Sequence, residues 1–411
     1  MVLAVTTLAG CSKSTREPPA PASGSAGSAA RVEAPTAAEW YRVVIGEKQG
    51  TAIPVFLHVP PTGAEAFIAT GPERVRAKLV SRPPALALEF EIFRTRITAT
   101  AGAGGALDGT FESSSGSWGA ASLSFRAEPV ATPDPTLRFP AAPGGPDAAG
   151  VWKLAFPDQG GKLTIKHGEG VELTASLAFQ TGNLALMAGS QEGRTVRLSA
   201  FDGAAPFMFV GELDEAGKAL TGTWTAGQAL AWKEAVTGER TEDFILEIQT
   251  RLASKRPKLA IPQIARAPYL GKPLIVELGG SWCPACGHAS GKLKELQTRY
   301  AAAGLQVVTL SYEFTEDPAY NKTQADAFKA KYQIPWEVIP VDGDLDRYNE
   351  ILPPGLEGID ASGFPITIFV AADGGIEGFH SGFPPAAWSD LHAAAIADYD
   401  RLAALIVAPR K

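Results

Sequence analysis

The sequence predicts an α/β domain at the C-terminal end of the chain, preceded by a mostly antiparallel β region. In the C-terminal part, the apolar run at residues 274–276 has the β-branching of a buried strand, and helical spacing begins soon after it. In the preceding part, apolar and polar residues alternate between Gly, Pro and Asp-Gly turns. A length of 411 residues accommodates two to three domains.

Two cysteines stand where the predicted strand passes into the predicted helix. Cys283 and Cys286 enclose Pro284, which suits a first helical turn because its missing N–H has no intrahelical partner there. The unpaired N–H groups of a helix start favour negative charge, so we expect a lowered thiol pKa at Cys283. Cys283 is therefore the candidate attacking thiolate, and Cys286 can resolve a mixed disulfide from one turn deeper.

A carboxylate lies inside the apolar strand, six residues before the first of these cysteines, at Glu277. Burial would raise the pKa of Glu277 toward the range useful for taking a proton from Cys286. The alternative is a paired core carboxylate that has no role in proton transfer.

Other uses of the cysteine pair fit the sequence less well. The chain has three cysteines and no second CxxC or HxxxH, which disfavours zinc. A c-type haem needs His directly after the second cysteine, where Gly287 stands, and His288 is expected on the helix surface. A purely structural disulfide would close too short a loop to stabilise much through chain entropy.

A further segment begins with Gly363-Phe364-Pro365 and continues as an apolar strand to residue 370. Proline at the mouth of a strand cannot donate to the ladder, and we expect a cis peptide before Pro365. Residues 373–375 then turn the chain into a hairpin partner.

Together, the Trp282-Cys283-Pro284-Ala285-Cys286 step, Glu277, Gly363-Phe364-Pro365 and the hairpin resemble the thioredoxin fold. Within that fold, these residues resemble the TlpA-like extracytoplasmic thiol-disulfide oxidoreductases, and the resemblance covers residues 262–411. It implies a central mixed sheet flanked by helices and a redox-active Cys283–Cys286 disulfide. It also implies catalytic roles for Glu277 and Pro365, substrate contacts from Trp282, Pro284 and Phe364, and no cofactor. The implied partners are protein thiols or disulfides and a membrane electron donor.

The N-terminus suggests a lipid anchor. Residues 8–11, Leu-Ala-Gly-Cys, resemble a lipobox, in which a signal peptidase cuts before the cysteine and Cys11 is acylated. We therefore predict a signal peptide at residues 1–11 and a flexible Ser/Pro/Ala/Gly tether at residues 12–38. No Lys or Arg precedes the apolar run, so we expect the true start to lie upstream, and a soluble terminus with a free cysteine is the alternative. These features predict a lipoprotein anchored on the periplasmic side of a bacterial membrane.

Residues 39–238 form the predicted β-rich region, which repeats itself. Trp40 matches Trp152, and Trp118 matches Trp232, at offsets of 112 and 114 residues. Two related units, at residues 39–130 and 150–238, would produce this register. The isolated His58 and His167 are typical of surface or core histidines, and residues 239–261 are predicted to be a linker helix and an extended segment.

The pattern also predicts the remaining elements of the C-terminal domain. They are a helix ended by Gly304, a strand at residues 305–312, a helix at 317–332, a strand at 336–341, a short helix at 344–351 and a final helix at 388–406.

These observations favour a membrane-anchored thiol-disulfide oxidoreductase that reduces protein disulfides in the cell envelope. The net charge of −7 disfavours nucleic-acid binding. Two alternatives remain, a binding or scaffold lipoprotein that acts through the β-rich region and a peroxide-reducing antioxidant protein. The direction of electron flow is left open, because Pro284 and Ala285 tune the potential without fixing it.

Overall fold

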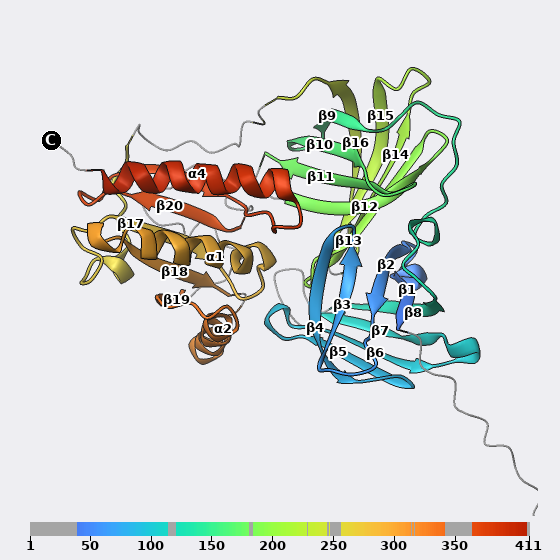
Figure 1. Ribbon diagram of the computed structural model, residues 1–411, viewed down its shortest axis with the longest axis horizontal. Helices are drawn as coiled ribbons and strands as arrows, with labels where there is room; N and C mark the ends of the chain where they lie inside the picture. Colours follow the sequence, from blue (N-terminus) through green and yellow to red (C-terminus); the bar gives the residue numbers. More distant parts are fainter. Residues whose placement is uncertain are drawn as a thin grey trace, which may run out of the picture. The chain divides into compact units, whose positions relative to one another are not determined.

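The computed structural model describes residues 39–113, 121–180, 184–227, 229–244, 246, 256–313, 315, 317–341 and 364–408. Ala37–Lys411 forms one compact unit. It contains two closed antiparallel barrels and a five-stranded sheet that carries helices (Figure 1). The predicted signal peptide, Cys11, the tether, Trp118, Gly363, the helix at 344–351 and residues 245 and 247–255 of the predicted linker lie outside the described residues. The β-rich region does not end at residue 238 as expected, because its last strand continues to Thr241, and residues 242–244 are loop rather than helix.

The first barrel closes where its first strand pairs with its eighth, with Trp40 opposite Val130. Its strands are β1 (Trp40–Ile45), β2 (Ile53–His58), β3 (Glu65–Thr70), β4 (Glu73–Ser81), β5 (Ala85–Phe90), β6 (Thr95–Ala101), β7 (Leu107–Ser113) and β8 (Ala121–Val130). The 3-10 helices η1 (Glu47–Gln49), η2 (Glu91–Phe93) and η3 (Ala103–Gly105) occupy its turns, and η4 (Pro135–Leu137) follows it.

The second barrel closes in the same way, through pairing of its first and last strands. Its strands are β9 (Gly150–Ala155), β10 (Gly160–His167), β11 (Leu173–Phe179), β12 (Leu184–Glu192), β13 (Thr195–Phe201), β14 (Pro206–Leu213), β15 (Ala219–Ala226) and β16 (Trp232–Thr241). The expected antiparallel β region is thus present, while a common origin of the two barrels stays a prediction.

Alternation along the strands fills each barrel with side chains. In β6, Thr95, Ile97 and Ala99 are buried and Arg96 is exposed, as the period of two requires. Eight strands leave an interior just wide enough for side chains, and Trp152 and Phe209 fill that of the second barrel. Sequence alternation predicts such strands, but it does not predict that the first and last strands meet.

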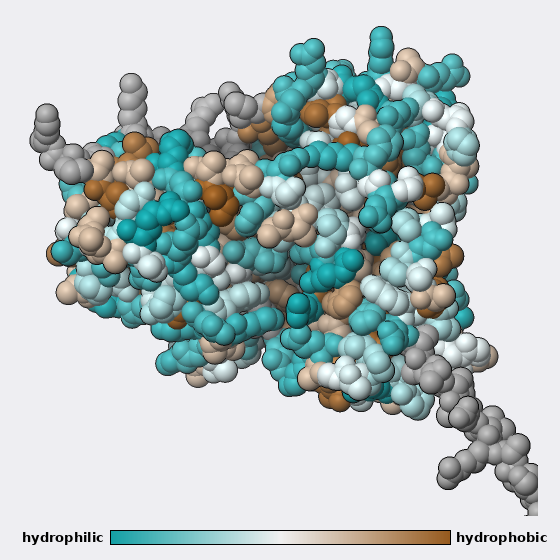
Figure 2. Space-filling model, viewed as in Figure 1, coloured by the Kyte–Doolittle hydropathy of each residue, from teal (hydrophilic) through white to brown (hydrophobic). Residues whose placement is uncertain are grey.

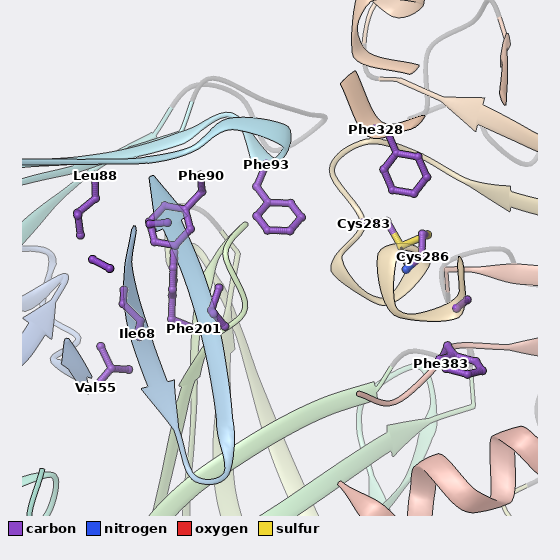
Figure 3. Close-up of a cluster of buried hydrophobic side chains, with 14 of the residues drawn as sticks. Val55, Ile68, Leu88, Phe90, Phe93, Phe201, Cys283, Cys286, Phe328 and Phe383 are labelled. Carbon is purple, nitrogen blue, oxygen red and sulfur yellow. Dashed lines mark hydrogen bonds between the residues drawn. A yellow bond between two sulfur atoms is a disulfide. The ribbon is translucent and has the colours of Figure 1, made fainter. Parts of the chain in front are cut away.

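One aromatic side chain links the two barrels. Phe201, at the end of β13, is 1% exposed and packs edge-on against Phe90 and Phe111 of the first barrel, with ring centroids 5.1 and 5.6 Å away. Beside it, Thr95 Oγ1 donates to the Gly203 carbonyl oxygen at 2.5 Å. One buried cluster contains side chains of the first barrel, Phe201 and the residues around Cys283 and Cys286 (Figure 3).

The C-terminal sheet has the order β19-β18-β17-β20-β21 and is mixed. β17 (Leu274–Gly279), β18 (Gln306–Tyr312) and β19 (Glu337–Val341) are parallel, whereas β20 (Ile366–Val370) and β21 (Ile376–Ser381) are antiparallel. Its helices are α1 (Pro284–Arg299), α2 (Pro318–Lys331) and α4 (Ser389–Val407), with η5 (Pro262–Ile264) before the sheet and η6 (Ala301–Ala303) after α1. This is the mixed, helix-flanked sheet expected of a thioredoxin-like domain.

The two faces of this sheet are buried by different parts of the chain. Leu293 of α1 and Leu402 of α4 belong to the cluster that contains Ile275 and Phe369. The neighbouring strand residues, such as Val276, point to the opposite face, which packs against residues 261–269. A strand that is buried on both faces has consecutive apolar residues rather than alternating ones, and residues 274–276 show this pattern.

One expectation in this domain was wrong in detail. α1 ends at Arg299 rather than at Gly304, because Tyr300 leaves the helical conformation and Gly304 instead ends η6 in the left-handed region at φ 78°. The space-filling view shows a face that is mostly hydrophilic, with hydrophobic residues scattered over it (Figure 2).

Candidate functional site: a disulfide at a helix start

The two cysteines form a disulfide at the first turn of α1. Their sulfur atoms are 2.06 Å apart and their Cα atoms 5.4 Å apart. Cys283 is the N-cap of the helix, and its sulfur accepts from the Cys286 backbone N–H at 3.1 Å. Cys283 is 2% exposed and Cys286 is fully buried. The helix start therefore directs its unpaired N–H groups at the sulfur of Cys283.

Two glycines before the pair allow the helix start to approach the strand end. A Cβ atom at Gly279 would lie 2.7 Å from the sulfur of Cys286. A Cβ atom at Gly280 would lie 2.4 Å from the Tyr312 carbonyl oxygen. Neither position accepts a side chain without displacing its neighbours, so both glycines set the position of the disulfide.

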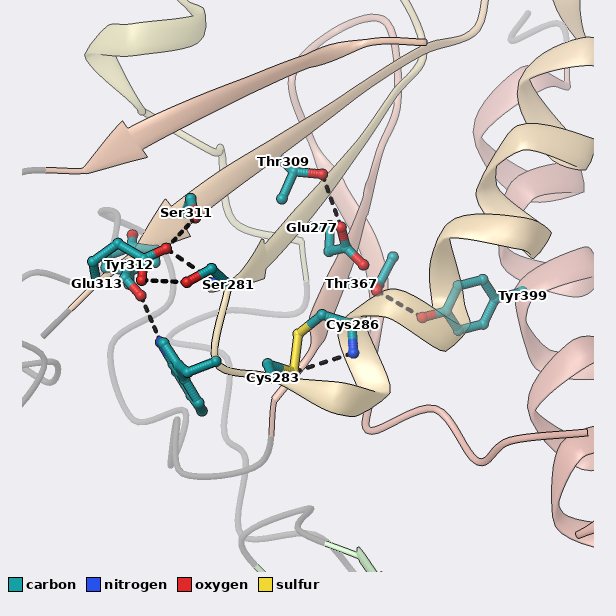
Figure 4. The surroundings of a disulfide bond; sticks show 11 residues. Glu277, Ser281, Cys283, Cys286, Thr309, Ser311, Tyr312, Glu313, Thr367 and Tyr399 are labelled. Carbon is teal, nitrogen blue, oxygen red and sulfur yellow. Dashed lines mark hydrogen bonds between the residues drawn. A yellow bond between two sulfur atoms is a disulfide. The ribbon is translucent and has the colours of Figure 1, made fainter. Parts of the chain in front are cut away.

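Glu277 lies fully buried on β17, beneath the helix that carries the disulfide (Figure 4). Its Oε2 accepts from Thr309 Oγ1 at 2.8 Å, and its Oε1 has no partner among the described residues. Burial raises the pKa of Glu277 to about 7. The direction agrees with the expectation from the sequence, whereas its role in proton transfer stays a prediction.

A second buried carboxylate, Glu313, was not singled out from the sequence. It accepts from the Ser281 backbone N–H at 3.0 Å, from Ser281 Oγ at 2.8 Å and from Ser311 Oγ at 2.8 Å (Figure 4). Glu313 thereby ties the loop before Cys283 to the end of β18. The available signal was weak: an acid directly after a buried strand, next to a loop that is remote in sequence.

The proline loop lies beside the cysteine loop. The peptide bond between Phe364 and Pro365 is cis, as expected. The rings of Phe364 and Trp282 meet edge-on with centroids 5.1 Å apart, and Trp282 Nε1 donates to the Tyr312 carbonyl oxygen at 2.8 Å. The structure thus brings the three residues predicted to contact substrate, Trp282, Pro284 and Phe364, to one cavity.

This cavity has a volume of about 310 Å³ and reaches Cys283. His288 also lies on this wall, where its side chain is partly exposed and its Nδ1 atom is buried. Burial, and secondarily the nearby His392, lowers the pKa of His288 to about 4, so the imidazole is neutral at neutral pH.

The described residues contain no group of His, Cys, Asp and Glu side chains that could hold a metal ion. Among these residues, no helix is both long and apolar enough to cross a membrane.

No family model and no curated protein matches the chain. Solved structures match parts of it. A putative thiol:disulfide interchange protein DsbE from Chlorobium tepidum is 19% identical over 39% of this chain and 98% of its own, with a TM-score of 0.27. A secreted Mycobacterium tuberculosis disulfide oxidoreductase homologous to E. coli DsbE is 20% identical over 31% and 83%, with a TM-score of 0.22. A DsbF homologue from Corynebacterium diphtheriae is 18% identical over 36% and 85%, with a TM-score of 0.24.

Proposed function

We propose that this chain is a thiol-disulfide oxidoreductase that reduces protein disulfides in the bacterial cell envelope. The observation that carries the proposal is the Cys283–Cys286 disulfide at the N-terminus of α1, with Cys283 on the wall of a cavity. A helix start favours the thiolate, and the thiolate is the form that attacks disulfides.

The reaction has two exchange steps. In the first, the reduced Cys283 thiolate attacks one sulfur of the substrate disulfide, and the other substrate sulfur leaves as a thiolate. In the second, the Cys286 thiolate attacks the Cys283 sulfur, and the substrate leaves reduced. Glu277 accepts the proton of Cys286 in this scheme, and Pro365 shapes the loop along which the substrate lies. Two electrons pass to the substrate, so a reductant, for which we propose a membrane electron carrier, must restore the thiols.

Trapping of the mixed disulfide tests this assignment. With Cys286→Ser, the reduced protein should accumulate a covalent adduct with an oxidised substrate, because the resolving thiol is missing. Cys283→Ser should form no adduct, and Cys11→Ser serves as the control that leaves the adduct unchanged. The adduct is read by mass spectrometry. Equal adduct formation by Cys283→Ser would overturn the assignment and favour a binding protein.

The direction of electron flow is tested by equilibration of the cysteine pair with glutathione. A reduction potential near about −270 mV supports the proposed reductase, whereas a value near about −120 mV supports an oxidant.

We also propose that Cys11 carries the lipid that anchors the protein on the periplasmic side of the membrane. The support is the Leu-Ala-Gly-Cys sequence that ends at Cys11. Membrane fractions of cells labelled with a clickable fatty acid should contain labelled protein. The Cys11→Ser variant should lose both the label and the membrane association. An unlabelled parent protein would contradict the anchor.

A further inference from the structure

The cavity beside the disulfide is built by one end of the second barrel as well as by the redox domain. β11, β13 and β15 finish at this end and β12, β14 and β16 begin there. Phe179, Phe207 and Trp224 form an aromatic group on its wall, with ring centroids 5.5 and 5.7 Å apart. Trp282, Phe364 and Phe383 line it from the redox domain. Because Cys283 is only 2% exposed yet lies on this wall, a substrate disulfide must enter the cavity to reach the sulfur.

Several buried polar atoms on the cavity wall have no hydrogen-bond partner among the described residues. Within the described part of the chain, Thr70 Oγ1, Gln159 Oε1, Trp224 Nε1 and His288 Nδ1 are buried and make no hydrogen bond. All four side chains line this one cavity, and Trp224 is 4% exposed and Thr70 1%. Buried polar groups in folded proteins are normally paired, so four at one cavity indicate a polar occupant. The set offers both donors and acceptors, which is what a peptide group requires.

The charge on the wall disfavours an anion. Among the described residues that line the cavity there is no Lys or Arg, and Glu73 and Asp202 supply carboxyl groups. Burial raises the pKa of both carboxyls, and with Asp202 nearby that of Glu73 reaches about 7. The cavity volume of about 310 Å³ lies at the small end of ligand pockets, which range from about 300 to 1,000 Å³. A cavity of this size is too small to admit the surface of a folded protein.

We propose that this cavity holds a short, uncharged, extended peptide segment in which an aromatic residue adjoins the cysteine whose disulfide is exchanged. The inference rests on the proposed function and adds its substrate class. The aromatic side chain packs against Phe179, Phe207 and Trp224, and the peptide groups pair with the unpartnered polar atoms. The second barrel is thus a selectivity element for the redox pair.

The test is a single-turnover exchange between the full chain, reduced and freed of reductant, and four disulfides. Three are the symmetrical disulfides of N-acetyl-Cys-Phe-amide, N-acetyl-Cys-Ala-amide and N-acetyl-Cys-Glu-amide, and bis(2-hydroxyethyl) disulfide is the reference. Rates are read by quenching and mass spectrometry. The Phe probe should react at least about tenfold faster than the Ala probe, which is the discrimination that apolar pockets reach, and the Glu probe should be slowest.

Two variants locate the preference in the cavity. Trp224→Phe keeps a ring but removes the Nε1 donor, and it should lower the ratio of the Phe-probe rate to the reference rate. Trp152→Phe is the matched control in the same barrel, because the Trp152 Nε1 is already bonded to the Ala148 carbonyl oxygen and does not line the cavity. It should leave the ratio unchanged.

Thr70→Val covers the case in which Trp224→Phe does not fold. Because the Thr70 hydroxyl has no partner among the described residues, this isosteric change should raise the melting temperature while it lowers the Phe-probe ratio. Equal rates for the three peptide probes would overturn the inference and leave the proposed function standing. Faster exchange with bis(2-hydroxyethyl) disulfide than with any peptide probe would do the same, because it would indicate that the substrate is a small-molecule disulfide. No exchange with any disulfide, the reference included, would overturn the proposed function itself.

Discussion

At the scale of single residues, Glu277 is a carboxylic acid held entirely out of water. It is fully buried, its Oε1 has no partner among the described residues, and its pKa is about 7. The unfolded chain releases this proton near the ordinary value of 4.5, whereas the folded chain keeps it until about 7. Between these values the native state binds more protons, so the free energy of unfolding falls as the pH rises through this window.

Glu277→Gln should remove this pH dependence. The carboxyl should cost roughly 3 kcal/mol of stability above pH 7, at about 1.4 kcal/mol per pKa unit. The free energy of unfolding of the variant, relative to that of the parent, should therefore increase as the pH rises from 5 to 8. Denaturant unfolding at each pH measures it. The exchange rate at pH 7 should fall by about 10²-fold if Glu277 takes the proton of Cys286. Parallel stability curves for the two proteins would contradict the raised pKa.

At the scale of elements, the site depends on how the end of β18 holds the loop before α1. Glu313 makes three hydrogen bonds there, to two groups of Ser281 and one of Ser311. The sequence could predict the strand, the cysteines and the helix start, because each is a local pattern. The sequence could not predict the hydrogen bonds between Glu313 and Ser281. These residues are 32 positions apart, and only the parallel pairing of β17 with β18 brings them together.

Glu313→Gln should destabilise the protein by about 2 kcal/mol, because the amide replaces one acceptor oxygen with a donor that faces hydroxyl groups. It should also slow exchange at Cys283, since the loop before the cysteine is no longer held. Urea unfolding and single-turnover kinetics measure the two effects. Glu65→Gln is the control: Glu65 forms a surface ion pair with Arg76, and its loss should change stability by less than about 0.5 kcal/mol. If Glu313→Gln changes stability and exchange rate no more than Glu65→Gln does, the hydrogen bonds of Glu313 do not hold the loop.

At the scale of the whole molecule, the two barrels and the redox domain pack against one another at several places. Phe201 of the second barrel packs against Phe90 and Phe111 of the first, and Lys331 of α2 lies over the Phe93 ring, 5.5 Å from its centroid. Cooperative unfolding of Ala37–Lys411 therefore depends on contacts between segments far apart in sequence.

Phe201→Ala should cost about 3 to 5 kcal/mol and separate the unfolding of the two barrels, since it leaves a cavity at their contact. Calorimetry should then resolve two transitions where the parent shows one. Phe209→Ala, inside the second barrel alone, should lower stability without splitting the transition. A single sharp transition for Phe201→Ala would show that other contacts couple the barrels.

The sequence by itself determined the local features of this protein. The apolar run, the cysteine pair at a helix start and the proline at a strand mouth each act over a few residues, and the disulfide, α1 and the cis peptide before Pro365 are where they were expected. The tertiary structure alone decided the closure of the two barrels, the burial of Glu313 and of the His288 Nδ1 atom, and the aromatic cavity in front of Cys283. These features arise from contacts between residues remote in sequence, and alternation along one strand does not specify which remote strand or side chain completes them.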